Sequence, residues 1–325
     1  MDINNNDNKN ESTPIIIGDE ENKTIENNFE NEENDTFIKP VKKTVMDKLL
    51  DKIPSLSVKN YKLVVALFIL VSIALAFFRV FVIEKSVESP GFVSENNYYK
   101  LEDTFYTNLF MIICVACGFV TLIFGLFSRK INFWENKHSN GFVFVSSLTG
   151  FCMVGCSGFF VYRIALNNET IGRFDLASII LMLMTGAYFV MDAVGFISKK
   201  VRPFCYVGVV VFSIVRLMAS FLELHDAQHV SSNEYHLVGL AVLLLFFTAN
   251  ARGNIDGKPS LAYPFFGLLS MVLLWTYSLP EIYILLYEPY YVDRTFIFCI
   301  VDAVLGMYVC AKLLSVKDTN SQYSE

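Results

Sequence analysis

Several ionisable residues of this 325-residue chain lie inside long apolar stretches, where a charge is costly unless it faces a partner or water. An embedded guanidinium suits two-point recognition of a carboxylate or phosphate group, and an embedded carboxyl group can carry a proton or a cation. Residues of these types are therefore candidates for binding a solute or an ion. The candidates are Arg79, Arg216, Glu223, Asp192 and Asp302.

The arginines also have a structural interpretation, in which they pair with carboxylates to join helices or reach the headgroups from helix ends. Position along the apolar stretches separates the two interpretations. Arg163 and Glu281 lie near helix ends, which favours the structural one. Arg79 and Arg216 lie about two turns inside, where the two interpretations are evenly balanced.

The two aspartates are the stronger functional candidates, because they lie furthest from the outer ends of the apolar stretches. Asp302 is expected near the middle of the membrane and Asp192 closer to the cytoplasmic side. One interpretation makes them proton or cation carriers. The other makes them donors in helix–helix hydrogen bonds, held in the protonated form by burial.

Three of the four histidines fall within 12 residues, between the end of the fifth apolar stretch and the start of the sixth. His225 and His229 are four residues apart, the spacing of H-E-x-x-H zinc helices, with Asp226 at the position of the catalytic glutamate. His236 or Glu234 is the expected third ligand of such a site. The sequence thus permits an outer-face Zn²⁺ site, but chance recurrence of a short motif in a wet loop is the favoured explanation.

A second short motif lies in the third apolar stretch and in the sixth. Gly155-Cys156-Ser157-Gly158 resembles the G-x-S-G motif of rhomboid intramembrane proteases, and His236-Leu237-Val238-Gly239 is similar to their H-x-x-G helix. The resemblance implies Ser157 as nucleophile and His236 as base. The direction expected for the third helix departs from that family, and a close-packing surface of small residues is the favoured alternative.

The apolar stretches themselves predict the fold class. Hydrophobic residues make up 54% of the chain, more than a soluble domain of this length keeps from water, and a membrane helix needs about 20 apolar residues. We predict an all-α, polytopic integral membrane protein whose residues 61–315 form eight transmembrane helices. The expected spans are 62–84, 105–127, 142–165, 176–198, 204–224, 235–251, 261–285 and 295–314.

Basic residues predict the orientation of these spans. Sixteen lysines and arginines flank one set of helix ends, and such residues stay on the cytoplasmic side. Both termini are therefore expected in the cytoplasm, in a bacterial cytoplasmic membrane or a eukaryotic plasma membrane or endomembrane. The opposite loops contain only Lys85, Lys100, Arg173 and Arg294.

Residues outside the apolar stretches suggest three further segments. Residues 1–40 are acidic and rich in asparagine, which predicts a disordered cytoplasmic tail. Residues 41–60 are expected to hold a short amphipathic helix on the inner membrane surface, and a plain solvated linker is an equally favoured alternative. Residues 316–325 form a cytoplasmic C-terminal tail. The acidic tail is a candidate for contact with a cytoplasmic partner.

Two weaker patterns complete the prediction. The sequence around Asp192 (Val-Met-Asp-Ala-Val) resembles that around Asp302 (Ile-Val-Asp-Ala-Val), which favours a 4+4 parallel internal repeat, a common plan of transporters. Tyrosines at the end of the seventh span predict an aromatic belt at the outer interface. These are Tyr277, Tyr283, Tyr287, Tyr290 and Tyr291.

The favoured function is binding or transport of a small polar or anionic solute, or an ion, through a polar cavity. A membrane-embedded hydrolase or metalloenzyme with an outer-face His/Asp/Glu site is one alternative, and a non-catalytic scaffold or sensor component is another. Enzymatic activity is less favoured, because no catalytic or nucleotide motif stands out. The partners expected are the lipid bilayer and a solute, with a homo-oligomer left open, and no basic-aromatic patch indicates nucleic acid.

Overall fold

The computed structural model describes residues 54, 56–86, 105–129, 131, 133, 139–167, 173–198, 201–226, 231–257, 260–287 and 294–316. These residues form a bundle of long α-helices. The helices are α3 (Val58–Ser86), α4 (Phe105–Ser128), α5 (Asn140–Asn167), α6 (Arg173–Val194), α7 (Arg202–Asp226), α8 (Ser231–Asp256), α9 (Ala262–Tyr287) and α10 (Arg294–Leu314).

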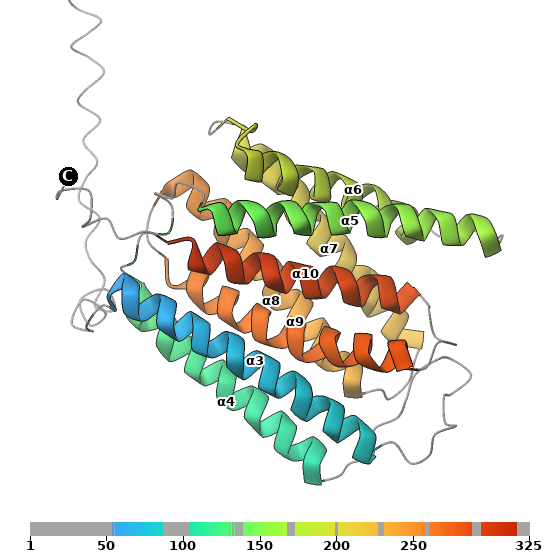
Figure 1. The fold of residues 1–325 in the computed structure, drawn as a ribbon, viewed down its shortest axis with the longest axis horizontal. Helices are drawn as coiled ribbons and strands as arrows, with labels where there is room; N and C mark the ends of the chain where they lie inside the picture. Colours follow the sequence, from blue (N-terminus) through green and yellow to red (C-terminus); the bar gives the residue numbers. More distant parts are fainter. Residues whose placement is uncertain are drawn as a thin grey trace, which may run out of the picture. The chain divides into compact units, whose positions relative to one another are not determined.

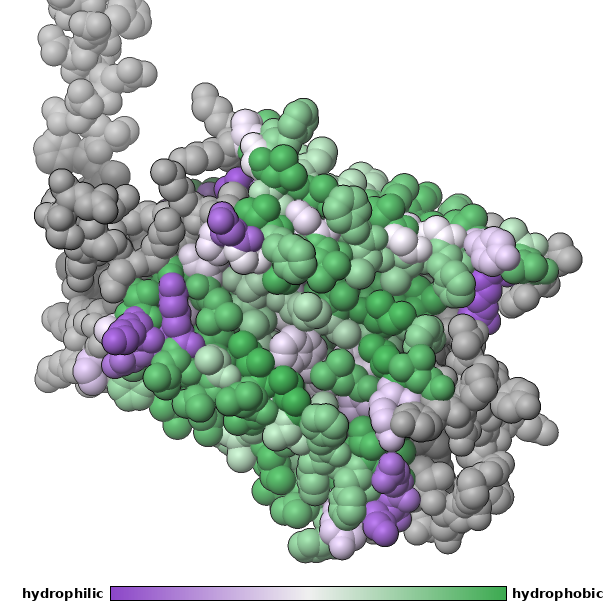
Figure 2. Space-filling view, viewed as in Figure 1, coloured by the Kyte–Doolittle hydropathy of each residue, from purple (hydrophilic) through white to green (hydrophobic). Residues whose placement is uncertain are grey.

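Each of the eight helices contains a stretch long and apolar enough to cross a membrane, which confirms the predicted all-α polytopic fold. The surface agrees with this placement, since apolar residues cover the bundle between two ends where the hydrophilic described residues gather (Figure 2). On α4, for example, Ile112 and Phe119 are each 64% exposed. Side chains of this kind suit contact with lipid and not with water.

Helices α9 and α10 form the centre of the bundle. In each, 72% of the most apolar window is buried, more than in any other span. The α3–α4 hairpin packs on one side of this pair, and the α5–α6 hairpin lies on the other, with α5 against α10 (Figure 1). Helices α7 and α8 close the arrangement, because α7 packs on α6 and α8 packs on α9.

We call one end of the bundle the inner end: helices α3, α5, α7 and α9 begin there, and helices α4, α6, α8 and α10 end there. The sequence predicts that this end is cytoplasmic. The opposite end is the outer end.

Every helix differs by a few residues from its predicted span, and two of the differences have local causes. Helix α6 ends at Val194 and not at 198, because Gly195 adopts a φ of +77° and the amides of Gly195 and Phe196 bond back to the carbonyls of Asp192 and Met191. This is a Schellman motif. Helix α8 continues to Asp256 beyond the expected end at 251, helped by the Arg252–Asp256 ion pair.

The packing of the helices follows the predicted 4+4 repeat only in part. The α5–α6 pair has its counterpart in the α9–α10 pair, and both pairs pack closely. However, α3 and α4 both pack against α9, and α8 also packs on α9. The repeat therefore remains a prediction. The acidic tail 1–40, the amphipathic helix expected before residue 54 and residues 317–325 lie outside the described residues.

The close contact between α5 and α6 depends on two glycines. A Cβ atom added to Gly150 would lie 2.5 Å from the carbonyl oxygen of Gly186, and one added to Gly186 would lie 2.8 Å from that of Gly150. By contrast, a Cβ added to Gly155 or Gly158 meets no atom within 4 Å. The close-packing surface predicted at Gly155 and Gly158 is therefore wrong, and the contact lies one to two turns earlier on α5.

Replacing Gly186 with alanine should lower the stability of the bundle by about 1–3 kcal/mol, because the added methyl group forces α5 and α6 apart. Gly155→Ala is the matched control, since it has open space and alanine has the higher helix propensity. Thermal unfolding in detergent measures both variants. Equal midpoints for the two would show that the α5–α6 contact is not tight.

Candidate functional site

Asp302 lies at the centre of a buried group of charged side chains in the outer half of the bundle. It is on α10, about 12 Å along the helix from Arg294, and it is 0% exposed. The neighbouring carbonyl of Ala303 accepts a 3.0 Å hydrogen bond from the indole nitrogen of Trp275 on α9. This bond ties the turn that contains Asp302 to the central helix of the bundle.

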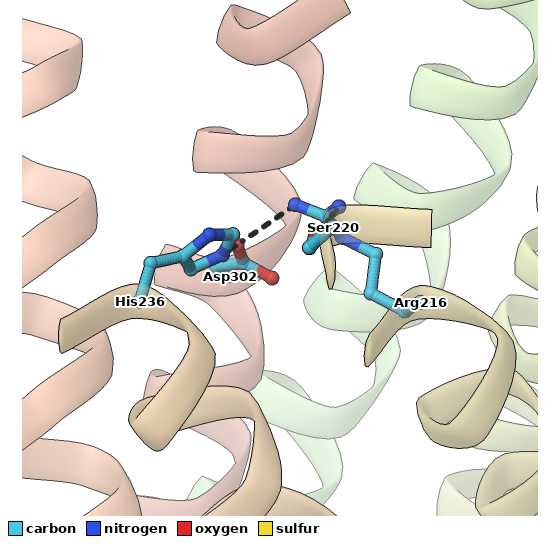
Figure 3. Close-up of polar contacts among 4 residues, drawn as sticks. All are labelled: Arg216, Ser220, His236 and Asp302. Atoms are coloured by element: carbon cyan, nitrogen blue, oxygen red, sulfur yellow. Dashed lines mark hydrogen bonds and ion pairs between the residues drawn. The ribbon is translucent and has the colours of Figure 1, made fainter. Parts of the chain in front are cut away.

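The Asp302 carboxylate meets a cationic group from one helix and an imidazole from another. Its Oδ2 atom lies 3.3 Å from a terminal nitrogen of Arg216 on α7 and 2.8 Å from Nε2 of His236 on α8. Figure 3 shows the guanidinium and the imidazole on opposite sides of the carboxylate. Because a carboxylate accepts, Nε2 of His236 carries the hydrogen of this contact.

Arg216 is held in place by two further contacts. Its other terminal nitrogen donates to the hydroxyl of Ser220, one turn along α7, at 2.6 Å. The guanidinium carbon lies 3.8 Å from the ring centroid of Phe298 on α10, a cation–π geometry. The guanidinium is thus fixed between α7 and α10 while only 3% of Arg216 is exposed.

A second ion pair joins this group through an aromatic ring. Arg79 on α3 lies 3.6 Å from the carboxylate of Glu281 on α9, and both residues are buried. The ring of Tyr277 stacks on the His236 imidazole at a centroid distance of 4.1 Å, and the Arg79 guanidinium lies 5.3 Å from the same ring. The contacts therefore run from α3 through α9, α8 and α10 to α7.

We call this group the outer charge cluster, consisting of Arg79, Arg216, His236, Glu281 and Asp302. Two guanidinium groups face two carboxylates, so the cluster has no net charge when His236 is neutral. Protonation of His236 would give it a charge of +1. A buried group with this composition can take up one proton at His236.

The outer charge cluster keeps unused hydrogen-bonding capacity. Neither Oδ1 of Asp302 nor Nε of Arg216 has a hydrogen-bond partner among the described residues, although both atoms are buried. Buried polar atoms in native proteins nearly always have a partner. One unmet acceptor and one unmet donor in the same cluster are suited to a small polar ligand.

The structure brings together some predicted site residues and separates others. Arg216 and Asp302 form one ion pair, and Arg79 belongs to the same cluster. Asp192 is elsewhere, in the last turn of α6, with its carboxylate 2.7 Å from Nε of Arg202 at the inner end. The side chain of Glu223 lies outside the described residues.

The interpretation of the arginines as open anion receptors is not supported at Arg79 and Arg216, since each already faces a carboxylate. Tyr277 also differs from its prediction. It was expected in an aromatic belt at the interface, but it is 4% exposed and lies inside the cluster. The sequence contains a pattern from which the inward position of Tyr277 could have been predicted. Tyr277 is seven residues after Ser270 and four before Glu281, and this spacing puts the three side chains on one face of α9.

The predicted zinc site remains a prediction. His236, one candidate third ligand of that hypothesis, contacts Asp302, and the side chains of His225 and His229 lie outside the described residues. Within the described parts of the chain, no group of three or more His, Cys, Asp and Glu side chains could hold a metal ion. All seven cysteines are described and free.

The serine–histidine dyad that the rhomboid resemblance implied is not formed. The hydroxyl of Ser157 donates to the carbonyl of Val154 on its own helix at 2.7 Å, and the His236 imidazole faces Asp302. His236 is therefore oriented by a carboxylate on α10 and not by a serine on α5. Comparison of the chain with protein-family models, with curated proteins and with solved structures finds no match.

Proposed function

We propose that this multi-pass membrane protein binds a small polar solute or ion at the outer charge cluster and carries it across the membrane, with Asp302 in contact with the ligand. One observation carries the proposal. Asp302 is fully buried within the membrane-spanning bundle, its Oδ2 faces both Arg216 and His236, and its Oδ1 has no partner among the described residues.

A purely structural role accounts less well for this arrangement. Burial of an ion pair costs free energy that is recovered only when the remaining hydrogen-bonding atoms are also satisfied. An apolar contact between α7 and α10 would join these helices without that cost. Ionisable residues that face the inside of a membrane bundle instead tend to mark the routes of solutes, ions and protons.

The chemistry of the cluster narrows the ligand. The Oδ1 atom of Asp302 accepts, so its partner is a proton, a cation such as an alkali or ammonium ion, or a solute that bears an N–H or O–H group. A solute with an acceptor would also meet the Nε of Arg216. Proton uptake at His236 then offers a way to couple ligand binding to a change in the charge of the cluster.

The proposal includes an orientation. With both termini in the cytoplasm, as the basic residues predict, the outer charge cluster is nearer the external face of the membrane. The Asp302 site then lies on the side where an external solute arrives. Proteolysis or labelling of tags added to the two termini in sealed vesicles checks this part independently.

Asp302→Asn should remove the stabilisation that a ligand gives to the purified protein. A ligand at about 100 times its dissociation constant stabilises the folded state by about 2.7 kcal/mol, which is visible as a higher unfolding midpoint. The panel contains Na⁺, K⁺, ammonium and small amino and hydroxy compounds. A compound that raises the midpoint of the native protein should have no effect on the Asp302→Asn variant.

Glu281→Gln is the matched control. Like Asp302→Asn, it removes one negative charge from the outer charge cluster, but the contact that it alters is the one to Arg79 and not those of Asp302. It should keep the response. The active compound is then tested for flux into proteoliposomes. A response that survives unchanged in Asp302→Asn would contradict Asp302 as the binding site. Binding without any flux would contradict the transport function.

A further inference from the structure

A second group of buried polar side chains lies toward the inner end of the bundle. Tyr188 on α6 and Tyr206 on α7 meet at a ring-centroid distance of 5.6 Å, and the ring of Phe247 on α8 connects Tyr206 to Tyr308 on α10 at 5.9 and 6.3 Å. Asn250 lies one turn after Phe247 on α8. We call Tyr188, Tyr206, Asn250 and Tyr308 the inner tyrosine cluster.

Several polar atoms of the inner tyrosine cluster are unpaired. Tyr206, Asn250 and Tyr308 are each 1% exposed. Neither their two hydroxyls nor the two amide atoms of Asn250 form a hydrogen bond of ordinary geometry with any described residue, although the Tyr206 hydroxyl lies beside the Asn250 side chain. A phenylalanine would fill the space of either tyrosine ring without leaving a hydroxyl unpaired.

Charged residues next to this cluster give it a positive balance. The Asp192 carboxylate faces Arg202, and Tyr188 and Tyr308 both interact electrostatically with Asp192. Lys312 interacts with the same carboxylate and the same guanidinium, and its Nζ lies 4.8 Å from the ring centroid of Phe142. Two cations against one carboxylate leave a charge of +1, in contrast to the balanced outer charge cluster.

The region has more groups that only donate hydrogen bonds than groups that only accept them. The guanidinium of Arg202 and the ammonium group of Lys312 only donate and the Asp192 carboxylate only accepts, while the phenol hydroxyls and the Asn250 amide can do both. Water carries no charge and therefore does not offset the excess positive charge of the region. A negatively charged ligand with several acceptor atoms does offset it, and also accepts hydrogen bonds from the donor groups.

The two cations of this region lie toward the inner end of the bundle and are partly exposed. The Arg202 side chain is 22% exposed at the start of α7, and Lys312 is half-buried near the end of α10. From these residues the polar side chains lead inward to the hydroxyls of Tyr206, one turn along α7, and Tyr308, one turn before Lys312.

We propose that the inner tyrosine cluster, with Arg202 and Lys312, binds the oxyanion group of a carboxylate or phosphate compound that enters from the inner end of the bundle. The phenol hydroxyls and the Asn250 amide donate to its oxygens, and the two cations balance its charge. A soluble anion and the headgroup of an anionic lipid both present this chemistry. The site is separate from Asp302 and does not depend on the function proposed for it.

The experiment measures the unfolding midpoint of the full-length protein in nanodiscs of phosphatidylcholine, with inorganic phosphate or acetate compared with chloride at equal ionic strength. Tyr206→Phe and Tyr308→Phe each remove one oxygen atom and keep the ring. Tyr61→Phe is the matched control. Tyr61 is 0% exposed, its hydroxyl also lacks a partner among the described residues, and its ring stacks on Phe124.

Phosphate or acetate should raise the unfolding midpoint of the native protein and of Tyr61→Phe. In Tyr206→Phe and Tyr308→Phe, the anion concentration that gives the same rise should be at least tenfold higher. In chloride alone, Tyr206→Phe and Tyr308→Phe should have higher unfolding midpoints than the native protein, because each phenylalanine removes an unpaired hydroxyl. Asp302→Asn should respond as the native protein does, which separates this test from that of the outer charge cluster.

The source of the anion follows from a second set of nanodiscs that contain phosphatidylglycerol. A rise in the midpoint that requires this lipid, and that is lost in Tyr308→Phe, identifies a headgroup site. A rise with phosphate or acetate in phosphatidylcholine alone identifies a site for a soluble anion. An equal response of the native protein and Tyr308→Phe, or no response to any of these anions and lipids, overturns the proposal.

Discussion

Asp302→Ala should lower the free energy of unfolding by about 3–5 kcal/mol, because it leaves the guanidinium of Arg216 buried without its carboxylate. Arg216 is only 3% exposed in the native protein. His236 loses its hydrogen-bond acceptor in the same variant. Unfolding in mixed micelles with an increasing fraction of denaturing detergent gives the difference from the native protein.

The double variant Arg216→Met/Asp302→Leu should recover most of this loss. Replacement of both partners by apolar side chains of similar size removes the unpaired charge and fills the space that the ion pair occupied. A double variant as unstable as Asp302→Ala alone would mean that the cost comes from lost packing and not from the charge. The ligand response described above should be absent in both variants.

The exposed ion pair of α8 provides the comparison. Arg252 and Asp256 are one turn apart, and their side chains are 83% and 43% exposed. Asp256→Ala should cost less than about 1 kcal/mol, since exposed pairs contribute little. The contrast between the two aspartates therefore measures the effect of burial on the same type of contact.

The number and type of the helices could be predicted from the sequence because the bilayer imposes length and hydropathy on each span separately. Individual helix ends were less predictable. The end of α6 depends on Gly195 in a left-handed conformation, a residue that was included within the fourth span. Glycine after an aspartate and two small apolar residues could have been recognised as a helix stop.

The candidate residues were recognised one at a time, but their partners were not. Asp302 and Arg216 are 86 positions apart in the chain, and their pairing depends on which face of each helix points inward and on how α7, α8 and α10 lie together. Helix rotation in a bundle is set by packing among all neighbours. The two similar aspartates, Asp192 and Asp302, consequently take different surroundings.

Small residues give a further example of this limit. The glycines of G-x-S-G looked like a packing surface, but Gly155 and Gly158 face open space, and the tight contact is made by Gly150 against Gly186. Gly150, Gly155 and Gly158 of α5 occur in similar local sequence. Only the position of α6 decides which of them needs to lack a side chain.

Trp275→Ala should lower the free energy of unfolding by about 3–5 kcal/mol, as large aromatic truncations in cores do. The indole is 9% exposed between the two central helices, and its nitrogen donates to the carbonyl of Ala303. The variant leaves a cavity beside the turn that contains Asp302. We therefore expect weaker binding at the outer charge cluster together with the lower stability, while Trp275→Phe should retain much of both.

The contact of the indole with Gly306 tests this explanation. A Cβ atom at Gly306 would collide with the Trp275 ring, so Gly306→Ala should destabilise the native protein through overpacking. In the Trp275→Ala background the same methyl group enters the cavity, so Gly306→Ala should there be neutral or stabilising. Additive effects of the two substitutions would show that Trp275 and Gly306 do not share a contact, and that α9 and α10 are held together by other residues.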